Sequence, residues 1–318
     1  MIVINQNNLL APIAVKVRRD LLAMIYQAES GHPGGSLSSV DLLVYLFLNE
    51  LEPPKDEGSK STYNRFILSK GHACPALYAV AAEVDYLDCI TFESFRKINS
   101  SLQGHPDACS LPWVETSTGS LGQGFSVALG MAMGLRYLKD PSHIYVMLGD
   151  GELQEGEVWE GAMCAGHYKL DNLCGIIDYN KMQSDDLNEN IMGLEPLRAK
   201  WEAFNWHVIE IDGHNFNEID KAFAEANTKK GKPTMIIAHT IKGKGVSYME
   251  GSPLWHGSVK LTEEDLIQAL LDLGTPEMEI RGYLDGTIWT ARQNTEFNWR
   301  QRGLFTRSIW QSLSEACR

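Results

Sequence analysis

The residues best suited to catalysis are histidines in short glycine-bearing loops. Four of them share this setting: His32 in Gly-His-Pro-Gly, His72 in Lys-Gly-His-Ala, His105 in Gly-His-Pro and His256 in Trp-His-Gly. An imidazole with a pKa near about 6.5 can accept or donate a proton at neutral pH. One such histidine is as often structural as functional, but four in the same kind of loop predict a shared pocket. The other five are interpreted as structural: His143, His167, His207, His214 and His239.

Two oxygen-bearing side chains follow successive apolar runs. The first run ends at Gly149-Asp150-Gly151, and the next ends in Ile-Ile-Asp-Tyr-Asn-Lys, which contains Asn180. If both runs are parallel strands, these side chains meet at the carboxyl edge of one sheet. A carboxylate and an amide oxygen suit Mg²⁺, or the more tolerant Ca²⁺, when a diphosphate supplies further oxygens. Gly-Asp-Gly alone is more often an ordinary turn, but the paired spacing favours a metal and diphosphate site.

The elements that position these motifs follow from the hydrophobic pattern. In the second half, strands alternate with helices: strands at 143–148, 173–178, 207–211 and 234–239, helices at 156–168, 194–205 and 217–226. Repeated β-α-β units predict an α/β fold with a parallel sheet and helices on both faces.

The first half reads as helices separated by the histidine loops. Helices are expected at 12–29, 40–51, from Pro75 onward, and at 121–138, with a last one at 262–273 capped by Thr262. Ser38 or Ser39 is expected to cap the second helix, because a short side-chain oxygen satisfies free N–H groups of a first turn. The glycine-rich helix 121–138 is expected to be buried, since its glycines otherwise cost helical stability.

Composition narrows the classes of protein. The chain has 318 residues, 44% of them hydrophobic, which excludes disordered, collagen-like and disulfide-stapled miniprotein classes. Its net charge of −13 argues against nucleic-acid binding. The six cysteines include no C-x-x-C pair, which is typical of reduced thiols. We expect no signal peptide, no membrane span and a cytoplasmic location.

The motifs S-G-H-P-G, S-K-G-H-A, G-H-P, T-G-S-L-G-Q-G, G-D-G-E-L-Q-E-G and D-Y-N-K occur in this order. The set resembles the N-terminal, diphosphate-binding half of transketolase, a thiamine diphosphate enzyme, from about Ala11 to about Lys260. The resemblance implies a thiamine diphosphate-binding fold over residues 1–274. The remaining tail, 275–318, matches nothing in the family pattern, and its tryptophans either form a partner surface or cover the core.

The resemblance also implies roles for single residues. The metal ligands would be Asp150, Asn180 and the main-chain carbonyl of Met182. The cofactor would contact His72, Gly119, Ser120, Leu121, Gly149, Asp150, Gly151, Glu152, Asn180, Lys242 and His256. Ser120 stands where the family more usually has proline, a change that should matter little to a backbone contact. Lys242 is alternatively a solvated lysine in a basic loop.

Catalytic roles are implied in the same way. His72 and His256 would lie near the diphosphate and the reacting carbon, and His32 and His105 would contact substrate hydroxyls. Glu155 and Glu160 match acidic residues that face the partner domain in the family. Alternatively, Glu155 simply favours the positive N-terminus of the following helix.

The family's activating carboxylate belongs to a pyrimidine-binding domain that this sequence lacks. We therefore expect one subunit of a split transketolase that is active only with a C-terminal, pyrimidine-binding partner, as an α2β2 heterotetramer. Helix 121–138 and the helix containing Trp159 and Glu160 would be buried at its interfaces.

The expected reaction transfers a two-carbon ketol unit from a ketose phosphate to an acceptor. Three alternatives stay open: a specialised biosynthetic enzyme with a carrier-bound acceptor, a deoxyxylulose-phosphate-synthase-like or dehydrogenase-type thiamine enzyme, and a non-catalytic binding subunit.

Overall fold

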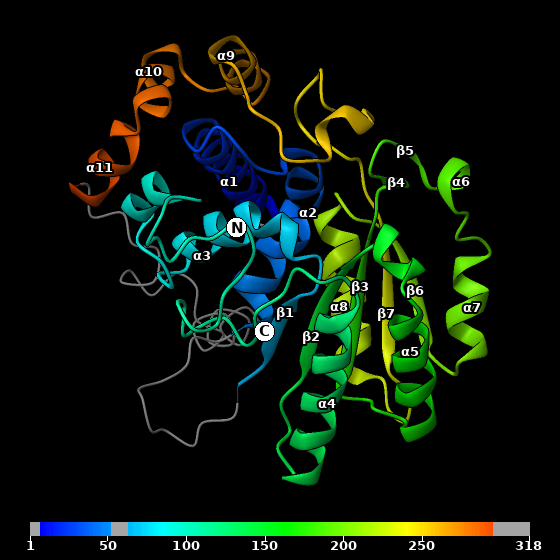
Figure 1. Cartoon of the computed structure of the whole chain (residues 1–318). Helices are drawn as coiled ribbons and strands as arrows, with labels where there is room; N and C mark the ends of the chain where they lie inside the picture. The colour runs from blue at the N-terminus through cyan, green and yellow to red at the C-terminus, as the bar shows by residue number, and fades with distance from the viewer. Residues whose placement is uncertain (1–6, 52–62, 295–318) are drawn as a thin grey trace, which may run out of the picture.

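A five-stranded parallel sheet lies at the centre of the computed structural model, which describes residues 7–51 and 63–294 (Figure 1). In spatial order its strands are β1 (Arg65–Leu68), β2 (Ile144–Gly149), β3 (Leu173–Tyr179), β7 (Thr234–His239) and β6 (His207–Asp212). Every neighbouring pair is parallel. The predicted α/β fold class is confirmed.

Helices cover both faces of the sheet. One face packs against α1 (Asn7–Gln27), α2 (Pro33–Tyr45), α3 (Cys74–Glu83) and α8 (Phe216–Thr228). The other packs against α4 (Gln123–Tyr137), α5 (Gly156–Tyr168) and α7 (Leu197–Ala203). Side chains of β2 alternate between the two cores, with Tyr145 in the first and Val146 in the second. Burial on both faces explains why the strands read as continuous apolar runs.

The smaller elements lie mostly in the loops. They are a hairpin of β4 (Met182–Gln183) and β5 (Asp186–Leu187), α6 (Asn188–Ile191), α9 (Glu263–Asp272), α10 (Glu277–Asp285), α11 (Thr287–Asn294), and short turns at Leu46–Glu50, Gly71–Ala73, Cys89–Ser94, Gly151–Gln154 and Pro253–Trp255.

The second helix begins earlier than the sequence suggested. α2 starts at Pro33, where a missing N–H costs nothing in a first turn, so the expected start at residue 40 is wrong. Ser38 and Ser39 are therefore inside the helix and cap nothing. Their hydroxyls donate to the carbonyl of Gly35 and to Asp178 instead. The earlier start places His32 directly at the N-terminus of α2.

The glycine-rich helix α4 is buried on one face only. Phe125, Ala128 and Ala132 pack in the second core, as expected. On the opposite face, a Cβ at Gly130 or Gly134 would meet no atom within 4 Å. The expected burial is therefore confirmed for one face of α4, and burial of the other face at an interface stays a prediction.

The C-terminal helices extend the first core. Thr262 forms a capping box with Asp265 at the start of α9, as predicted. In α11, Trp289 is fully buried and its Nε1 donates to Asp20 of α1 at 3.0 Å. Residues 275–294 thus cover the core, and the rest of the tail, 295–318, lies outside the described residues. Throughout 7–51 and 63–294, no helix has both the length and the apolar character needed to cross a membrane.

Candidate active site at the carboxyl edge of the sheet

A cavity of about 970 Å³, part of it open to solvent, lies at the carboxyl ends of β2 and β3. Its lining comprises His32, Gly35, Lys70, His72, Gly119, Leu121, Gly149, Asp150, Gly151, Glu152, Gln154, Glu155, Asn180, Met182, Gln183, Ser184, Lys242 and His256. Of the site residues expected from the sequence, His105, Ser120 and Glu160 are missing from it. Ligands of open parallel sheets bind at this edge, so the position agrees with the topology.

Three of the loop histidines form a cluster in this cavity. The ring centroids of His32 and His72 are 5.4 Å apart, and those of His72 and His256 are 5.6 Å apart. His32 and His256 are 6.4 Å apart and nearly perpendicular. Three loops that are distant in the sequence thus bring three imidazoles to one point.

His105 is exposed and lies against the Gly119 loop, outside the lining of the histidine cavity. Gly119 has a φ of +145°, and a Cβ at this position would lie 2.9 Å from Cδ2 of His105. Only glycine combines this backbone conformation with such a close contact. His105 therefore supports the loop that precedes Leu121.

Burial keeps these imidazoles neutral at neutral pH. It lowers the pKa of His32 to about 4, with the nearby guanidinium of Arg96 as the next cause. Burial, followed by the Lys242 ammonium, lowers the pKa of His256 to about 3. The pKa values of His72 and His105 are also lowered, mainly by burial. A neutral imidazole carries one donor and one acceptor, which is the state that proton exchange with a substrate hydroxyl requires.

Asp150 and Asn180 lie at adjacent strand ends, as the spacing predicted. Asp150 follows β2 and is 3% exposed; its Oδ1 accepts the N–H of Gly151 at 2.8 Å. Asn180 follows β3, and its Oδ1 accepts the N–H of Met182 at 3.1 Å. Burial, and then the nearby carboxylate of Asp178, raises the pKa of Asp150 to about 6. A cation that binds beside this buried carboxylate would stabilise its ionised form.

Lys242 is part of the cavity floor and not a solvated lysine. Its side chain is 1% exposed, and burial lowers its pKa to about 8. The ammonium donates to the carbonyl of Met182 at 3.2 Å and to Nδ1 of His256 at 2.6 Å. Because Nδ1 accepts this bond, the proton of neutral His256 is on Nε2.

Glu152 holds three loops of the cavity together. Its Oε2 accepts the N–H of Gly149 at 3.0 Å, and its Oε1 accepts the N–H of Gly122 at 2.8 Å and the hydroxyl of Ser69. These partners belong to the Asp150 loop, the Gly119 loop and the end of β1. The carboxylate thus faces the protein, although the residue lines the cavity as expected.

Sequence reasoning missed a buried ion pair beneath the cavity. Lys70 and Asp178 are 1% and 0% exposed in their side chains and form a salt bridge. Asp178 also accepts hydroxyls from Ser38 at 2.6 Å and from Thr240, so it joins α2, β3 and the end of β7. Although burial alone would raise the pKa of Asp178, the Lys70 ammonium holds it below its usual value. Both residues occur inside the recognised motifs, but nothing in their spacing indicates that they pair.

Glu155 and Glu160 are exposed at the mouth of the cavity and on the outer face of α5. Glu155 directly precedes the first turn of α5, and its side chain makes no capping hydrogen bond there. The expected role of both carboxylates toward a partner stays a prediction.

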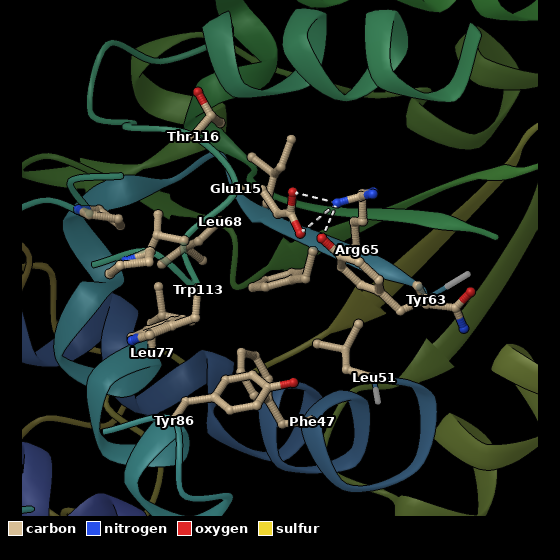
Figure 2. Close-up of a pocket in the computed structure, with 16 residues that line it drawn as sticks. Phe47, Leu51, Tyr63, Arg65, Leu68, Leu77, Tyr86, Trp113, Glu115 and Thr116 are labelled. Carbon is tan, nitrogen blue, oxygen red and sulfur yellow. Dashed lines mark hydrogen bonds and ion pairs between the residues drawn. The ribbon is translucent and has the colours of Figure 1, made fainter. Parts of the chain in front are cut away.

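A second hollow, of about 620 Å³, lies between β1 and the loop of residues 106–116 (Figure 2). Aromatic and aliphatic side chains line it, among them Phe47, Tyr86 and Trp113. Arg65 crosses its upper side and pairs with Glu115 at 3.1 Å. No sequence motif predicted this hollow, and its lining shares no residue with that of the histidine cavity.

The chain is similar to known proteins over most of its length. Residues 12–281 match the family model for the thiamine diphosphate-binding domain of transketolase. The chain is 42% identical over 257 residues to the 6-deoxy-6-sulfo-D-fructose transketolase subunit SqwG of Clostridium sp., covering 81% of this chain and 93% of the relative. It is 39% identical to an apulose-4-phosphate transketolase subunit of Phocaeicola vulgatus, covering 78% and 88% of the two chains.

Longer transketolases match over only part of their length. Human transketolase is 41% identical over 246 residues, which are 76% of this chain and 39% of the human protein. The structure of transketolase from Leishmania mexicana superposes with a TM-score of 0.79 at 28% identity, covering 90% of this chain and 45% of that one. The resemblance inferred from the motifs is confirmed. This chain belongs to the transketolase family and carries its thiamine diphosphate-binding domain.

Proposed function

We propose that this chain is the diphosphate-binding subunit of a two-subunit transketolase that moves a two-carbon ketol unit from a ketose phosphate to an acceptor. The observation that carries the proposal is the cluster of three neutral imidazoles directly beside Asp150, Asn180 and two buried lysines. Two relatives of about the same length as the matched region are themselves named as transketolase subunits.

The cavity suits a diphosphate held through a divalent metal. Asp150, Asn180 and the carbonyl of Met182 offer oxygen ligands, which Mg²⁺ and Ca²⁺ prefer. Among residues 7–51 and 63–294, no three His, Cys, Asp or Glu side chains converge as a metal-binding group. Mg²⁺ is commonly bound through one or two carboxylates together with phosphate oxygens. Lys242 would add a second positive charge near the diphosphate.

Thiamine diphosphate, when bound, supplies a nucleophilic thiazolium carbon. The chain's own residues would orient the ketose and handle its protons. His256 offers an Nε2–H donor, because its Nδ1 already accepts from Lys242. His32 and His105 would exchange protons with substrate hydroxyls, and His72 would lie nearest to the diphosphate.

The outer face of α4 and α5 is suited to the partner subunit. The two helices lie side by side on one side of the sheet, and Arg136 of α4 donates to the carbonyl of Tyr168 of α5 at 2.6 Å (Figure 1). Gly130 and Gly134 leave open space, and several large apolar side chains are exposed: Val127, Met133, Tyr137, Leu138, Met163 and Tyr168. An apolar face of this kind marks an interaction site. We propose that it binds a pyrimidine-binding subunit in an α2β2 assembly, with Glu155 and Glu160 at its edge.

The test is to assemble the chain with its candidate partner and to supply thiamine diphosphate, Mg²⁺, a ketose phosphate and an aldose phosphate. The proposal predicts a product two carbons longer than the acceptor, and loss of that product in Asp150→Ala. A carrier-bound acceptor, offered in parallel, distinguishes the specialised biosynthetic alternative. If the assembled complex binds thiamine diphosphate but transfers no ketol unit to either acceptor, the catalytic proposal is wrong and a binding subunit remains.

A further inference from the structure

Arg96 lies where the loops of three candidate catalytic histidines meet. Its Nη1 donates to the hydroxyl of Ser30 and, at 3.1 Å, to the hydroxyl of Ser258. Ser30 is two residues before His32, and Ser258 is two residues after His256. One guanidinium thus connects the N-terminal loop with a loop more than two hundred residues later.

The same side chain packs against the loop of the third histidine. A Cβ at Gly104 would lie 2.6 Å from Nε of Arg96, so glycine at this position lets the guanidinium approach the backbone next to His105. The backbone N–H of Arg96 donates to the carbonyl of Leu102 at 2.8 Å, which fixes the start of that loop.

The loops of His32 and His256 are also joined by a backbone hydrogen bond. The N–H of Val259 donates to the carbonyl of Gly31 at 2.8 Å, directly beside the contacts of Arg96. Arg96 itself has a left-handed φ of +59° and is half-buried. It does not line the histidine cavity. The guanidinium therefore contacts the loops that carry the histidines without lining the cavity.

We propose that Arg96 is a positioning residue for ketol transfer, which holds the loops of His32, His105 and His256 in their mutual arrangement. This inference rests on the proposed function of the cavity. An arginine suits the role because its planar fork presents several donors in fixed directions, which a lysine ammonium cannot reproduce. Here Nη1 donates to both Ser30 and Ser258, while Nε and Nη2 lie against Gly104.

The charge of Arg96 gives the proposal a specific signature. It is the first charged group to lower the pKa of both His32 and His105, after burial. The other charged or titratable groups facing His32 are His72, His105, Lys242 and His256. Removing the guanidinium raises the pKa of both imidazoles, so the neutral form is lost at a higher pH. The acid limb of the rate profile should move upward in pH.

The first experiment compares Arg96→Gln, Arg96→Lys and the matched control Lys97→Gln in the assembled enzyme. Arg96→Gln should lower kcat by up to about 10²-fold, the scale of a small misplacement of catalytic groups, with unchanged thiamine diphosphate affinity. Its acid limb should move to higher pH. Arg96→Lys should restore the acid limb but not kcat, because lysine keeps the positive charge but lacks the planar guanidinium group. Lys97→Gln, an exposed neighbour, should match the wild type in every respect.

The second experiment uses hydrogen exchange on the isolated chain and needs no activity. Arg96→Gln should accelerate exchange of the Val259 amide and of the residues around Ser30 and His105, while Lys97→Gln leaves them unchanged. If the wild-type assembly shows no ketol transfer but exchange responds as expected, the proposed function fails and the contact role of Arg96 stands.

A variant that keeps Arg96 controls for the possibility that Arg96→Gln fails to fold. Ser258→Ala removes one partner of the guanidinium and should give a smaller loss of kcat in the same direction. Wild-type kcat, an unmoved acid limb and unchanged exchange in Arg96→Gln would overturn the proposal. An effect confined to KM for phosphorylated substrates would also overturn it, because that result indicates direct contact with an anion.

Discussion

Glu152 offers the sharpest mutational prediction, because all its partners are hydrogen-bond donors. The N–H groups of Gly122 and Gly149 and the hydroxyl of Ser69 all point at its carboxylate. Burial raises the pKa of Glu152, while the hydrogen bonds from Ser69, Gly122 and Gly149 act in the opposite direction and favour the carboxylate. Glu152→Gln keeps the size and shape of the side chain but introduces an NH2 group. In either orientation of the amide, its NH2 group then faces a backbone N–H, so two donors meet.

The expected cost follows from that mismatch. Leaving one buried donor without an acceptor costs about 1–3 kcal/mol, with charged partners at the upper end. Gly149 precedes Asp150 and Gly122 ends the Gly119 loop, so much of the cost should fall on the arrangement that binds the cofactor. A loss of about 2 kcal/mol in that arrangement weakens binding by about 30-fold. Glu152→Ala removes all three acceptors and should weaken it further.

Calorimetry of thiamine diphosphate binding to the assembled protein, with Mg²⁺ present, measures this effect. Chemical denaturation of the same variants reports the part of the cost that falls on global stability. Glu264→Gln, an exposed carboxylate in the first turn of α9, is the matched control and should change neither quantity. Wild-type affinity and stability in Glu152→Gln would show that Glu152 does not hold the loops of the cavity in place.

Further predictions concern the metal, the histidines, the buried lysine and the partner face. Asp150→Ala, or EDTA, should abolish retention of thiamine diphosphate; unchanged calorimetric affinity with EDTA present would contradict the metal site. Alanine at His32 or His105 should lower turnover by about 10²- to 10⁴-fold while cofactor binding survives, and full activity in both would remove them from the mechanism. The pKa of Lys242 is lowered to about 8 and should rise beside a diphosphate, so binding of thiamine diphosphate near pH 8.5 should take up protons. Calorimetry in buffers of different ionisation enthalpy measures this uptake. If no protons are taken up, the diphosphate does not bind beside Lys242. Tyr137→Glu, on the outer face of α4, should prevent assembly with the partner, as measured by sedimentation velocity. If assembly is undisturbed, the interface lies elsewhere on the chain.

The sequence predicted the sheet and the site well because both depend on local pattern. The strand at Thr234–His239 and the helix at Gly156–Tyr168 have their predicted bounds, since turn residues flank both apolar segments. Asp150 and Asn180 meet because parallel topology sends successive strand ends to one edge. The three clustered histidines followed from their common loop type.

What the sequence did not predict depends on distant parts of the chain or on other molecules. The pair of Lys70 and Asp178 joins residues 108 positions apart, and only the folded sheet brings them together. Arg96 gains its partners from loops at both ends of the domain, so no local spacing reveals it. The glycine-rich helix 121–138 was expected at an interface only through the family resemblance, because small residues indicate close packing without indicating which molecule supplies it.

We propose that this chain supplies half of an active site. Titrating the candidate pyrimidine-binding subunit onto a fixed amount of this chain, with thiamine diphosphate, Mg²⁺ and ketose phosphate saturating, tests it most directly. Ketol transfer should be absent from either subunit alone and should rise linearly to a plateau at one partner per chain. Full turnover by this chain without any partner would show that it carries a complete active site.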